Sequence, residues 1–516
     1  MTKTDLQMID RFLALGDMER AVELAERAIL DGSTSLVLRL RLVSIYLKQY
    51  KYREASRLIA ESARLKPGNS GEWIELAKRL IYFNESHALL GLVERVLAEK
   101  LPPAGWQADL AAMLSMTGEQ EIALKLQERV IGAAQAFPAW HYNRSQMHMY
   151  LGRFAEAERD LRICLAREPG MARAYWALSK LPGAPLSETE LDRMRRLSSK
   201  CSDSEEEVFL QYALFNFLDR FDHINEAWQA LARGCQVKRK LLNYDEGKTQ
   251  AYFQSLMKNF GRSLHASPSP EYEESTVTPI FIVGMHRSGT TLLESLLCRH
   301  SAIAGGGELY DFPAQLRHAI GRHFNGPSDI AVLENLPSID FSSVGARYLE
   351  RVAWRAGGRS LLIDKLPSNF INIGYIRRAL PHAKVVHIGR NPMDTCFSNL
   401  KELFSNACAY SYDQGELMHY YRWHKQLMEH WQTLFPGFVL DISFEKLTEN
   451  PEREVRCVLE FCGLDFQTDC LDTGGNSKAV NSASSVQVRE PIHRRGVDAW
   501  RRYSPYLDKL RAEFNE

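Results

Sequence analysis

The sequence predicts a chain of two parts, an N-terminal all-α solenoid of helical repeats followed by a three-layer α/β domain with a parallel sheet. Three observations lead to this prediction. Alanines recur every 33 to 35 residues in the N-terminal third, short apolar runs alternate with helical periodicity after residue 280, and a Ser/Pro-rich stretch separates the two patterns. At 516 residues the chain is long enough for about two to four domains.

The N-terminal repeats are marked by a small residue at the start of one amphipathic helix in each unit. These residues lie 34, 33, 35 and 34 positions apart: Ala21, Ala55, Ala88, Ala123 and Ala157. The period resembles that of tetratricopeptide repeats over about residues 5–180. The alternative is an unrelated helical bundle, and five sustained units argue against it. The resemblance implies a solenoid whose concave face holds a peptide or another protein.

Past Pro182 the tight period is lost, but helical spacing continues and Ala227 stands in a repeat-like place. The stretch "SLHASPSPEYEESTVTP" is typical of a linker. We therefore expect a tetratricopeptide-repeat solenoid, an additional helical repeat-like segment, a linker and an α/β domain at residues 1–182, 183–262, 263–279 and 280–516.

Composition excludes several classes of protein. The net charge is zero and the pI is about 7.2, so we expect neither a nucleic-acid nor a membrane-surface partner. No apolar run approaches the roughly 18 residues needed to cross a bilayer. The nine cysteines show no CxxC pair and no metal-ligand spacing, which favours reduced thiols. The sequence thus predicts a soluble cytoplasmic protein without a metal site.

A candidate anion site follows the first predicted strand, residues 280–283. The stretch "GMHRSGTTLLE" has the glycine spacing of a phosphate-binding loop that leads into a helix. A nucleotide triphosphatase would place lysine after Gly289, and that position is Thr290. Arg287, Thr290 and Thr291 instead suit an oxyanion held by hydrogen bonds and one guanidinium, without a metal.

A second candidate anion site lies in "VVHIGRNPMDTCFSNL". Arg390 ends a predicted strand, and Ser398 lies two turns into the next helix, so the pair could clamp a second phosphate. Asn391, Pro392 and Asp394 suit the start of that helix, and we assign them to capping alone.

Together these motifs resemble the sulfotransferase superfamily over about residues 278–510. "RSGTT" is similar to the family's 5′-phosphosulfate loop, and Arg390 with Ser398 looks like its 3′-phosphate pair. The resemblance implies the donor 3′-phosphoadenosine-5′-phosphosulfate (PAPS), the product 3′,5′-adenosine bisphosphate (PAP) and no metal. The implied donor contacts in the loop are Arg287, Ser288, Gly289, Thr290 and Thr291. The loop's arginine and "GELYDF" are most similar to tyrosylprotein sulfotransferases and to bacterial sulfotransferases with tetratricopeptide repeats.

The resemblance also implies catalytic residues. Glu308, after the glycine run 305–307, matches the family's glutamate base, which takes the proton of the acceptor hydroxyl. Lys365, in "IDKLPSNF", resembles the lysine that contacts the bridging oxygen. Arg287 is implied to stabilise developing charge. The alternatives are a surface glutamate in a loop for Glu308 and a salt bridge to Asp364 for Lys365.

Near the C-terminus, Ser484 looks like a late serine that contacts the transferring group, with Ser482 or Ser485 as alternatives. Arg489 or His493 takes the place of the family's basic donor contact. Phe444 stands where the tyrosine-sulfating branch usually shows Tyr, so a donor-side hydroxyl is missing. A glutamate base leaves no chemical need for the histidines at positions 286, 300 and 387, which we expect to be structural.

These residues predict transfer of a sulfuryl group from PAPS to a hydroxyl acceptor, best matched by tyrosine of a peptide or protein bound in part by the solenoid. Carbohydrate, phenol and lipid hydroxyls stay open as acceptors. A P-loop phosphotransferase and an inactive nucleotide-binding scaffold are the rival functions. Related enzymes often pair, so a homodimer is also possible.

Overall fold

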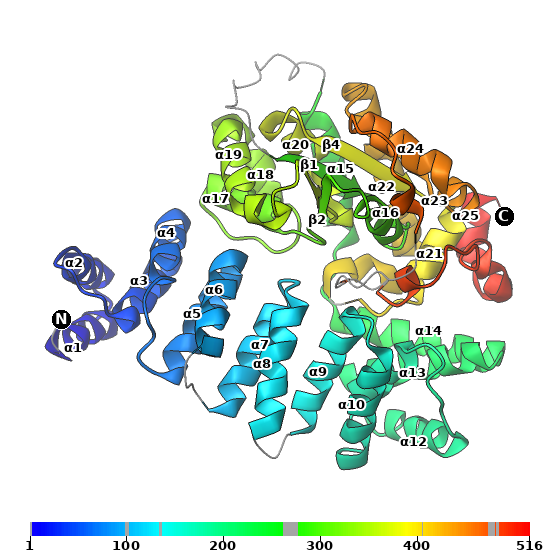
Figure 1. The fold of residues 1–516 in the computed structure, drawn as a ribbon, viewed down its shortest axis with the longest axis horizontal. Coiled ribbons are helices and arrows are strands. Elements are labelled where there is room, and N and C mark those ends of the chain that lie inside the picture. Colours follow the sequence, from blue (N-terminus) through cyan, green and yellow to red (C-terminus); the bar gives the residue numbers. More distant parts are fainter. Residues whose placement is uncertain are drawn as a thin grey trace. The chain divides into compact units, whose positions relative to one another are not determined.

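The computed structural model describes residues 3–98, 103–133, 137–261, 277–404, 406–472, 480 and 485–515. In these residues an all-helical N-terminal region precedes an α/β region with a five-stranded parallel sheet (Figure 1). The predicted fold class is confirmed. Most of the predicted linker, residues 263–276, lies outside the described residues.

The N-terminal region consists of helices joined by short turns. Their bounds are α1 Lys3–Ala14, α2 Met18–Leu30, α3 Leu36–Lys48, α4 Tyr52–Ser62, α5 Ser70–Tyr82, α6 Ser86–Ala98, α7 Ala104–Ser115, α8 Gln120–Ala133, α9 Pro138–Tyr150, α10 Phe154–Arg167, α11 Ala172–Lys180, α12 Glu188–Ser198, α13 Glu205–Arg220, α14 Ile224–Leu241 and α15 Glu246–Asn259.

The small repeat residues lie at helix contacts. Ala21, Ala55, Ala123 and Ala157 are fully buried, and each belongs to the second helix of a pair such as α3 with α4 or α9 with α10. A larger side chain there would force the two helices apart, which explains why alanine recurs with the repeat period.

Spatial contacts divide the chain into two compact units. One unit contains residues 1–136 and 310–340, and the other contains residues 137–309 and 341–516. In the first, Arg53 of α4 donates 2.9 Å to the carbonyl of His318, at the end of α17 (Asp311–Ile320). In the second, the Tyr212 hydroxyl of α13 donates 3.1 Å to the carbonyl of Leu400. The helical repeats are therefore shared between the units.

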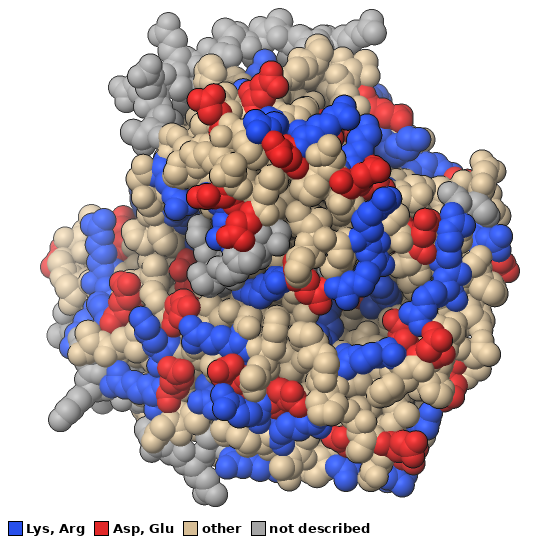
Figure 2. Space-filling model, turned by 45° about the vertical axis from the view of Figure 1, so that its right-hand side comes forward, with Lys and Arg blue, Asp and Glu red and all other residues tan. Residues whose placement is uncertain are grey.

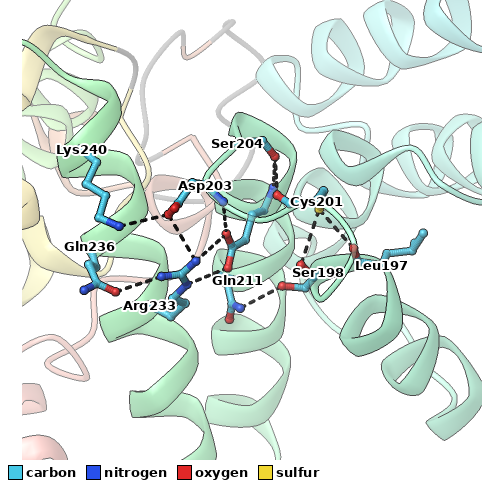
Figure 3. A network of polar contacts seen from close by, with 10 residues as sticks. Leu197, Ser198, Cys201, Asp203, Ser204, Gln211, Arg233, Gln236 and Lys240 are labelled. Atoms are coloured by element: carbon cyan, nitrogen blue, oxygen red, sulfur yellow. Dashed lines mark hydrogen bonds and ion pairs between the residues drawn. The ribbon is translucent and has the colours of Figure 1, made fainter.

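A polar network ties α12, α13 and α14 together at the α12–α13 turn (Figure 3). The Arg233 guanidinium donates to both carboxylate oxygens of Glu207 and to Asp203, and Lys240 also pairs with Asp203 at 3.2 Å. Asp203 has φ +53°, a left-handed conformation that its backbone and side-chain contacts fix. This network stabilises the packing of the helices that lie beside the α/β elements in the second unit.

The sheet has the strand order β2-β3-β1-β4-β5, and all neighbours are parallel. The central β1 pairs Ile280 with Ile363 of β3 and Val283 with His387 of β4. Four strands occupy predicted apolar runs, and β2 was not predicted. The bounds are β1 Thr278–Val283, β2 Ile303–Gly305, β3 Leu361–Asp364, β4 Lys384–Gly389 and β5 Val439–Ser443.

Helices cover the sheet because its strands are apolar on both faces, as in β1, where residues 279–283 are buried. The remaining helices longer than five residues are α16 Thr290–Leu297, α17 Asp311–Ile320, α19 Phe341–Val352, α20 Ile373–Ala379, α21 Pro392–Leu400, α22 Gln414–Leu434, α23 Phe444–Glu449, α24 Pro451–Phe461 and α25 Asp508–Phe514, and the shorter α18 is Ile330–Glu334.

The carboxyl ends of four neighbouring strands lead into the predicted site residues. Arg287 follows β1, Glu308 follows β2, Lys365 follows β3 and Arg390 follows β4. Since parallel strands end at the same edge, the sheet brings these side chains to one side of the second unit.

Among the described helices, none combines the length and the apolar character that a membrane crossing requires. Acidic and basic side chains are interspersed over the face seen in Figure 2, in keeping with a net charge of zero.

Candidate active site

The loop after β1 needs glycine at both ends. A Cβ on Gly284 would lie 2.6 Å from the carbonyl oxygen of Ile388 on β4, so the loop leaves the sheet in close contact with the neighbouring strand. Gly289 has φ +108°, and a Cβ there would lie 2.4 Å from the Phe444 ring. The N-cap of α16 is Gly289, which has no side chain to cap the helix, and the first amides of α16 point into the loop, where an anion would be stabilised.

Arg287 adopts a left-handed backbone conformation with φ +67°. This conformation costs a non-glycine residue about 1 kcal/mol or more, and such strain is often found at functional sites. It directs the side chain toward α21, where Nε donates 3.3 Å to the Ser398 hydroxyl. The Arg287 side chain is only 6% exposed. The loop and α21 are thus joined through a predicted residue of each motif.

Arg390 forms a second link between the two predicted anion sites, in addition to the hydrogen bond between Arg287 and Ser398. Its Nη1 donates 2.9 Å to the Arg287 carbonyl, and its Nη2 donates to the Gly496 carbonyl. The guanidinium lies 4.6 Å above the Phe444 ring. Burial, with a smaller contribution from Arg287, lowers the Arg390 pKa to about 10, so the side chain stays charged at neutral pH. Among the described residues, its buried Nε has no hydrogen-bond partner.

These groups line a cavity of about 340 Å³. Of the predicted donor contacts, Arg287, Gly289, Thr291, Arg390 and Ser398 lie in its wall. The other lining residues are Leu292, Asp394, Phe397, Lys401, Phe444, Val488, Glu490, Pro491, Ile492, His493, Arg495, Gly496 and Ala499. The two motifs therefore share one cavity, whose wall is rich in basic groups.

Lys401 is a basic residue of the cavity that the sequence analysis missed. Burial, opposed by Asp219 and assisted by Arg287 and Arg390, lowers its pKa to about 8. It lies three residues beyond Ser398, on the same face at the end of α21. That spacing could have identified it.

Glu308 and Lys365 form an ion pair next to the loop. Lys365 Nζ lies 2.8 Å from Glu308 Oε1 and 3.9 Å from Glu294 of α16. Burial alone would lower the Lys365 pKa, but Glu308 and Glu294 outweigh it and raise the pKa. Asp364 accepts from the Tyr348 hydroxyl at 3.0 Å, and its charge adds to the rise in the Lys365 pKa.

Glu294 was also missed, although it lies one helical turn beyond Thr290. Its Oε1 accepts a 3.0 Å hydrogen bond from the Gly307 amide, next to Glu308. The Gly307 carbonyl in turn accepts from the Lys365 amide at 2.8 Å. Glu294 thereby fixes the backbone on which the predicted base and lysine stand.

His286 lies near the charged groups of the site. Its Nδ1 is 3.2 Å from the Tyr410 hydroxyl. Burial lowers its pKa to about 4, and the charges of Glu308, Lys365 and Arg287 act on it as well. The imidazole is therefore neutral at physiological pH. His300 and His387 make contacts that fit a structural role, to the Asp465 carbonyl and to Asp441.

The C-terminal predictions fare differently. Ser482 and Ser484 lie outside the described residues. Ser485 is buried, and its carbonyl accepts from Arg489 at 2.6 Å.

Arg489 is not part of the described cavity wall, and it donates 2.7 Å to the Tyr150 carbonyl, at the end of α9. The guanidinium anchors the C-terminal segment to the end of α9, and the donor contact of Arg489 stays a prediction. His493 does line the cavity.

The capping prediction for α21 is confirmed for Asn391, which accepts from the Asp394 amide at 3.2 Å, and for Pro392 at the first turn. Asp394 has a role beyond the start of the helix. Its carboxylate accepts from the Asp498 amide at 2.8 Å, which fixes the segment that carries Arg495 into the cavity wall.

Residues 279–468 match the profile described as "Sulfotransferase family". The C-terminal half of this chain contains a sulfotransferase family domain. Its bounds enclose the loop after β1, Glu308, Lys365 and α21, whereas the cavity-wall residues 488–499 lie beyond them.

Two curated relatives show how far the similarity extends. An uncharacterized protein of Aquifex aeolicus (strain VF5) is 32% identical over 311 residues, which are 57% of this chain and 40% of that protein. The chain thus spans well under half the length of that relative. A putative protein-tyrosine sulfotransferase of Caenorhabditis briggsae is 22% identical over 231 residues, which are 43% of this chain and 80% of that protein.

Among solved structures, the sulfotransferase domain from the Synechococcus PCC 7002 olefin synthase is 19% identical and covers 45% of this chain and 90% of that domain, with a TM-score of 0.33. A likeness at this level adds nothing to what the strand order already shows.

Proposed function

We propose that this chain is a sulfotransferase that moves a sulfuryl group from PAPS to a hydroxyl acceptor. The observation that carries the proposal is the hydrogen bond from Arg390 Nη1 to the Arg287 carbonyl, because it joins two anion motifs in the wall of one cavity. One adenine nucleotide with two phosphate-bearing ends fits such a pair. The family match over residues 279–468 supports the same donor.

In this proposal the loop residues Arg287 to Thr291 bind the 5′ end of the donor, and Arg390 with Ser398 binds the 3′-phosphate. The donor supplies an activated sulfuryl group when bound. The loop amides, the α16 N-terminus and Arg287 stabilise charge that develops on the phosphate leaving group. Lys365 adds a fixed positive charge, because Glu308 and Glu294 raise its pKa.

Glu308 is the proposed base. Its side chain is 31% exposed, so an acceptor hydroxyl from solvent can reach it, whereas the paired Lys365 is 2% exposed. The carboxylate takes the proton of the acceptor hydroxyl as the oxygen attacks the sulfuryl group. Ser484 remains a proposed contact of the transferring group.

For the acceptor we propose tyrosine in a peptide or protein, bound in part by the helical repeats. The similarity to a putative protein-tyrosine sulfotransferase supports this choice. Tetratricopeptide-like repeats commonly present a concave surface to extended chains. Carbohydrate, phenol and lipid hydroxyls are the alternative acceptors.

The test is transfer from radiolabelled PAPS in the presence of EDTA, with a panel of tyrosine peptides, their phenylalanine counterparts, sugars, phenols and lipids. We expect label on tyrosine peptides and none on the phenylalanine controls. Label on another class of hydroxyl would retain the activity and change the acceptor. PAP binding without any transfer would favour the inactive scaffold, and preferential binding of ATP would favour a phosphotransferase.

A further inference from the structure

A buried carboxylate outside both anion motifs, that of Glu402, lies next to Arg287. Glu402 follows the C-terminal end of α21, and the residue is 7% exposed. One of its oxygens, Oε2, lies 4.0 Å from Arg287 Nη1. The other oxygen, Oε1, is ion-paired with Lys180, the last residue of α11. A single carboxylate thus lies between a residue of the anion loop and a residue of the helical region, all in the same compact unit.

Because Glu402 is buried, its charge must be stabilised by nearby cations. A carboxylate taken out of water loses several kcal/mol of solvation, and only close cations offset the loss. Lys180 and Arg287 supply that compensation, with side chains 20% and 6% exposed. Lys180 also lies 5.7 Å above the Trp176 ring of its own helix, a cation–π contact that restricts it further. The three charged groups therefore have few alternative positions.

Glu402 offsets the like-charge repulsion that the other basic groups of the cavity wall exert on Arg287. Arg390 donates to its carbonyl, and the cationic Lys401 lies in the same cavity wall. Ser398 accepts from Nε at 3.3 Å but offers no negative charge. Without Glu402, like-charge repulsion would favour other rotamers of the guanidinium.

We propose that Glu402 is a positioning residue that orients Arg287 for sulfuryl transfer, and that Lys180 of α11 keeps Glu402 in place. The helix α11 is then part of the transfer machinery, in addition to any role of the repeats in binding an acceptor. This inference rests on the proposed sulfotransferase function.

Three substitutions test the proposal: Glu402→Gln, Lys180→Met and Lys180→Arg. We expect E402Q and K180M each to lower kcat about tenfold, because small misplacements of a reacting group are costly, while the PAPS KM and the PAP affinity change less than about threefold. K180R keeps the ion pair and should retain kcat within about twofold of the unmodified protein. In the double variant E402Q/K180M, the effects should not add, because both changes act on one contact.

The matched control is Glu416→Gln. Glu416 forms a two-pronged ion pair with Arg239 of α14 at 2.6 Å, also between the helical region and the α/β elements, and neither residue lines the cavity. We expect E416Q to lower the thermal unfolding temperature without lowering kcat. Equal kcat losses in E416Q and E402Q, a normal kcat in K180M, or additive effects in the double variant would overturn the positioning role.

The two proposals fail in different ways. If the unmodified protein binds neither PAP nor PAPS, the proposed function fails. If it binds PAP and transfers label but E402Q retains full kcat, only the inference about Glu402 fails.

Discussion

At the scale of single residues, Glu308 is the most direct test of the proposed chemistry. Its carboxylate reaches solvent while its Lys365 partner is buried. We expect Glu308→Gln to lower kcat by about 10²- to 10⁴-fold with PAP affinity unchanged, since the amide cannot accept the proton. Steady-state kinetics and calorimetric titration measure the two quantities. Glu460→Gln, on the exposed face of α24, serves as the control. Near-normal turnover of E308Q would remove Glu308 from the role of base.

Lys401 predicts a pH dependence of donor binding. Its pKa is lowered to about 8, mainly by burial, so it is a cation below that pH and neutral above it. A phosphate dianion is bound better by the cation. The PAP affinity should therefore fall about three- to tenfold between pH 7 and 9.5, by linkage to one titrating group.

Calorimetric titration of PAP across this pH range measures the effect. Lys401→Arg keeps its charge and should show a flat profile, whereas Lys401→Met should bind weakly at every pH. An unchanged slope in K401R would show that another group titrates.

Two buried imidazoles predict how stability responds to acid. Burial lowers the pKa of His286 to about 4 and that of His424 well below its usual range, the latter also because His387 lies beside it. Below about pH 6.5 the unfolded chain binds protons at these positions and the folded chain does not. The free energy of unfolding should therefore decrease as the pH falls from 6.5 toward 4.

Urea unfolding monitored by tryptophan fluorescence at several pH values tests this dependence. Replacing His286 or His424 by glutamine should reduce the slope over that range. A slope that neither substitution alters would assign the effect to other groups.

At the scale of elements, the loop after β1 determines the site, and Gly289 is its most constrained position. Alanine there has an unfavourable φ of +108° and a Cβ 2.4 Å from the Phe444 ring. We expect Gly289→Ala to weaken PAP binding more than tenfold, since strain of about 1–3 kcal/mol adds to a steric clash in the cavity wall. Gly463→Ala is the matched control, because it has φ +75° and open space. Equal PAP affinity of the two variants would contradict the role of the loop.

The sequence predicted these elements to an uneven degree, for physical reasons. Four strands are four to six residues long and rich in Val, Ile and Leu, whereas β2 (Ile303–Gly305) is too short for periodicity to reveal it. Arg287 and Arg390 could be found because each follows a strand. The contacts of Arg489 could not be predicted, because the short 3₁₀ turns of the C-terminal segment show no sequence periodicity from which the side chain's orientation could be inferred. Glu402 could not be found from spacing, because its role depends on contact with Lys180, 222 positions away in the chain.

At the scale of the whole molecule, each compact unit is built from two separate segments of the sequence. Residues 310–340 pack with the first repeats, although Glu308 stands just before them in the other unit. All described residues that line the cavity belong to the second unit. On adding PAP, we expect slower hydrogen exchange in residues 284–297, 390–402 and 485–500 and no change in α1–α8, because ligand binding stabilises the elements it contacts. Protection confined to α1–α8 would place the nucleotide elsewhere.

The central claim is that the two anion motifs bind the 5′ end and the 3′-phosphate of one nucleotide. A crystal structure of the complex with PAP tests this claim most directly. We predict the 5′-phosphate against the loop amides and Thr290 and Thr291, and the 3′-phosphate within hydrogen-bond distance of Arg390 and Ser398, with a single ribose between them. A structure with PAP bound at one motif while the other contacts only solvent would contradict the account.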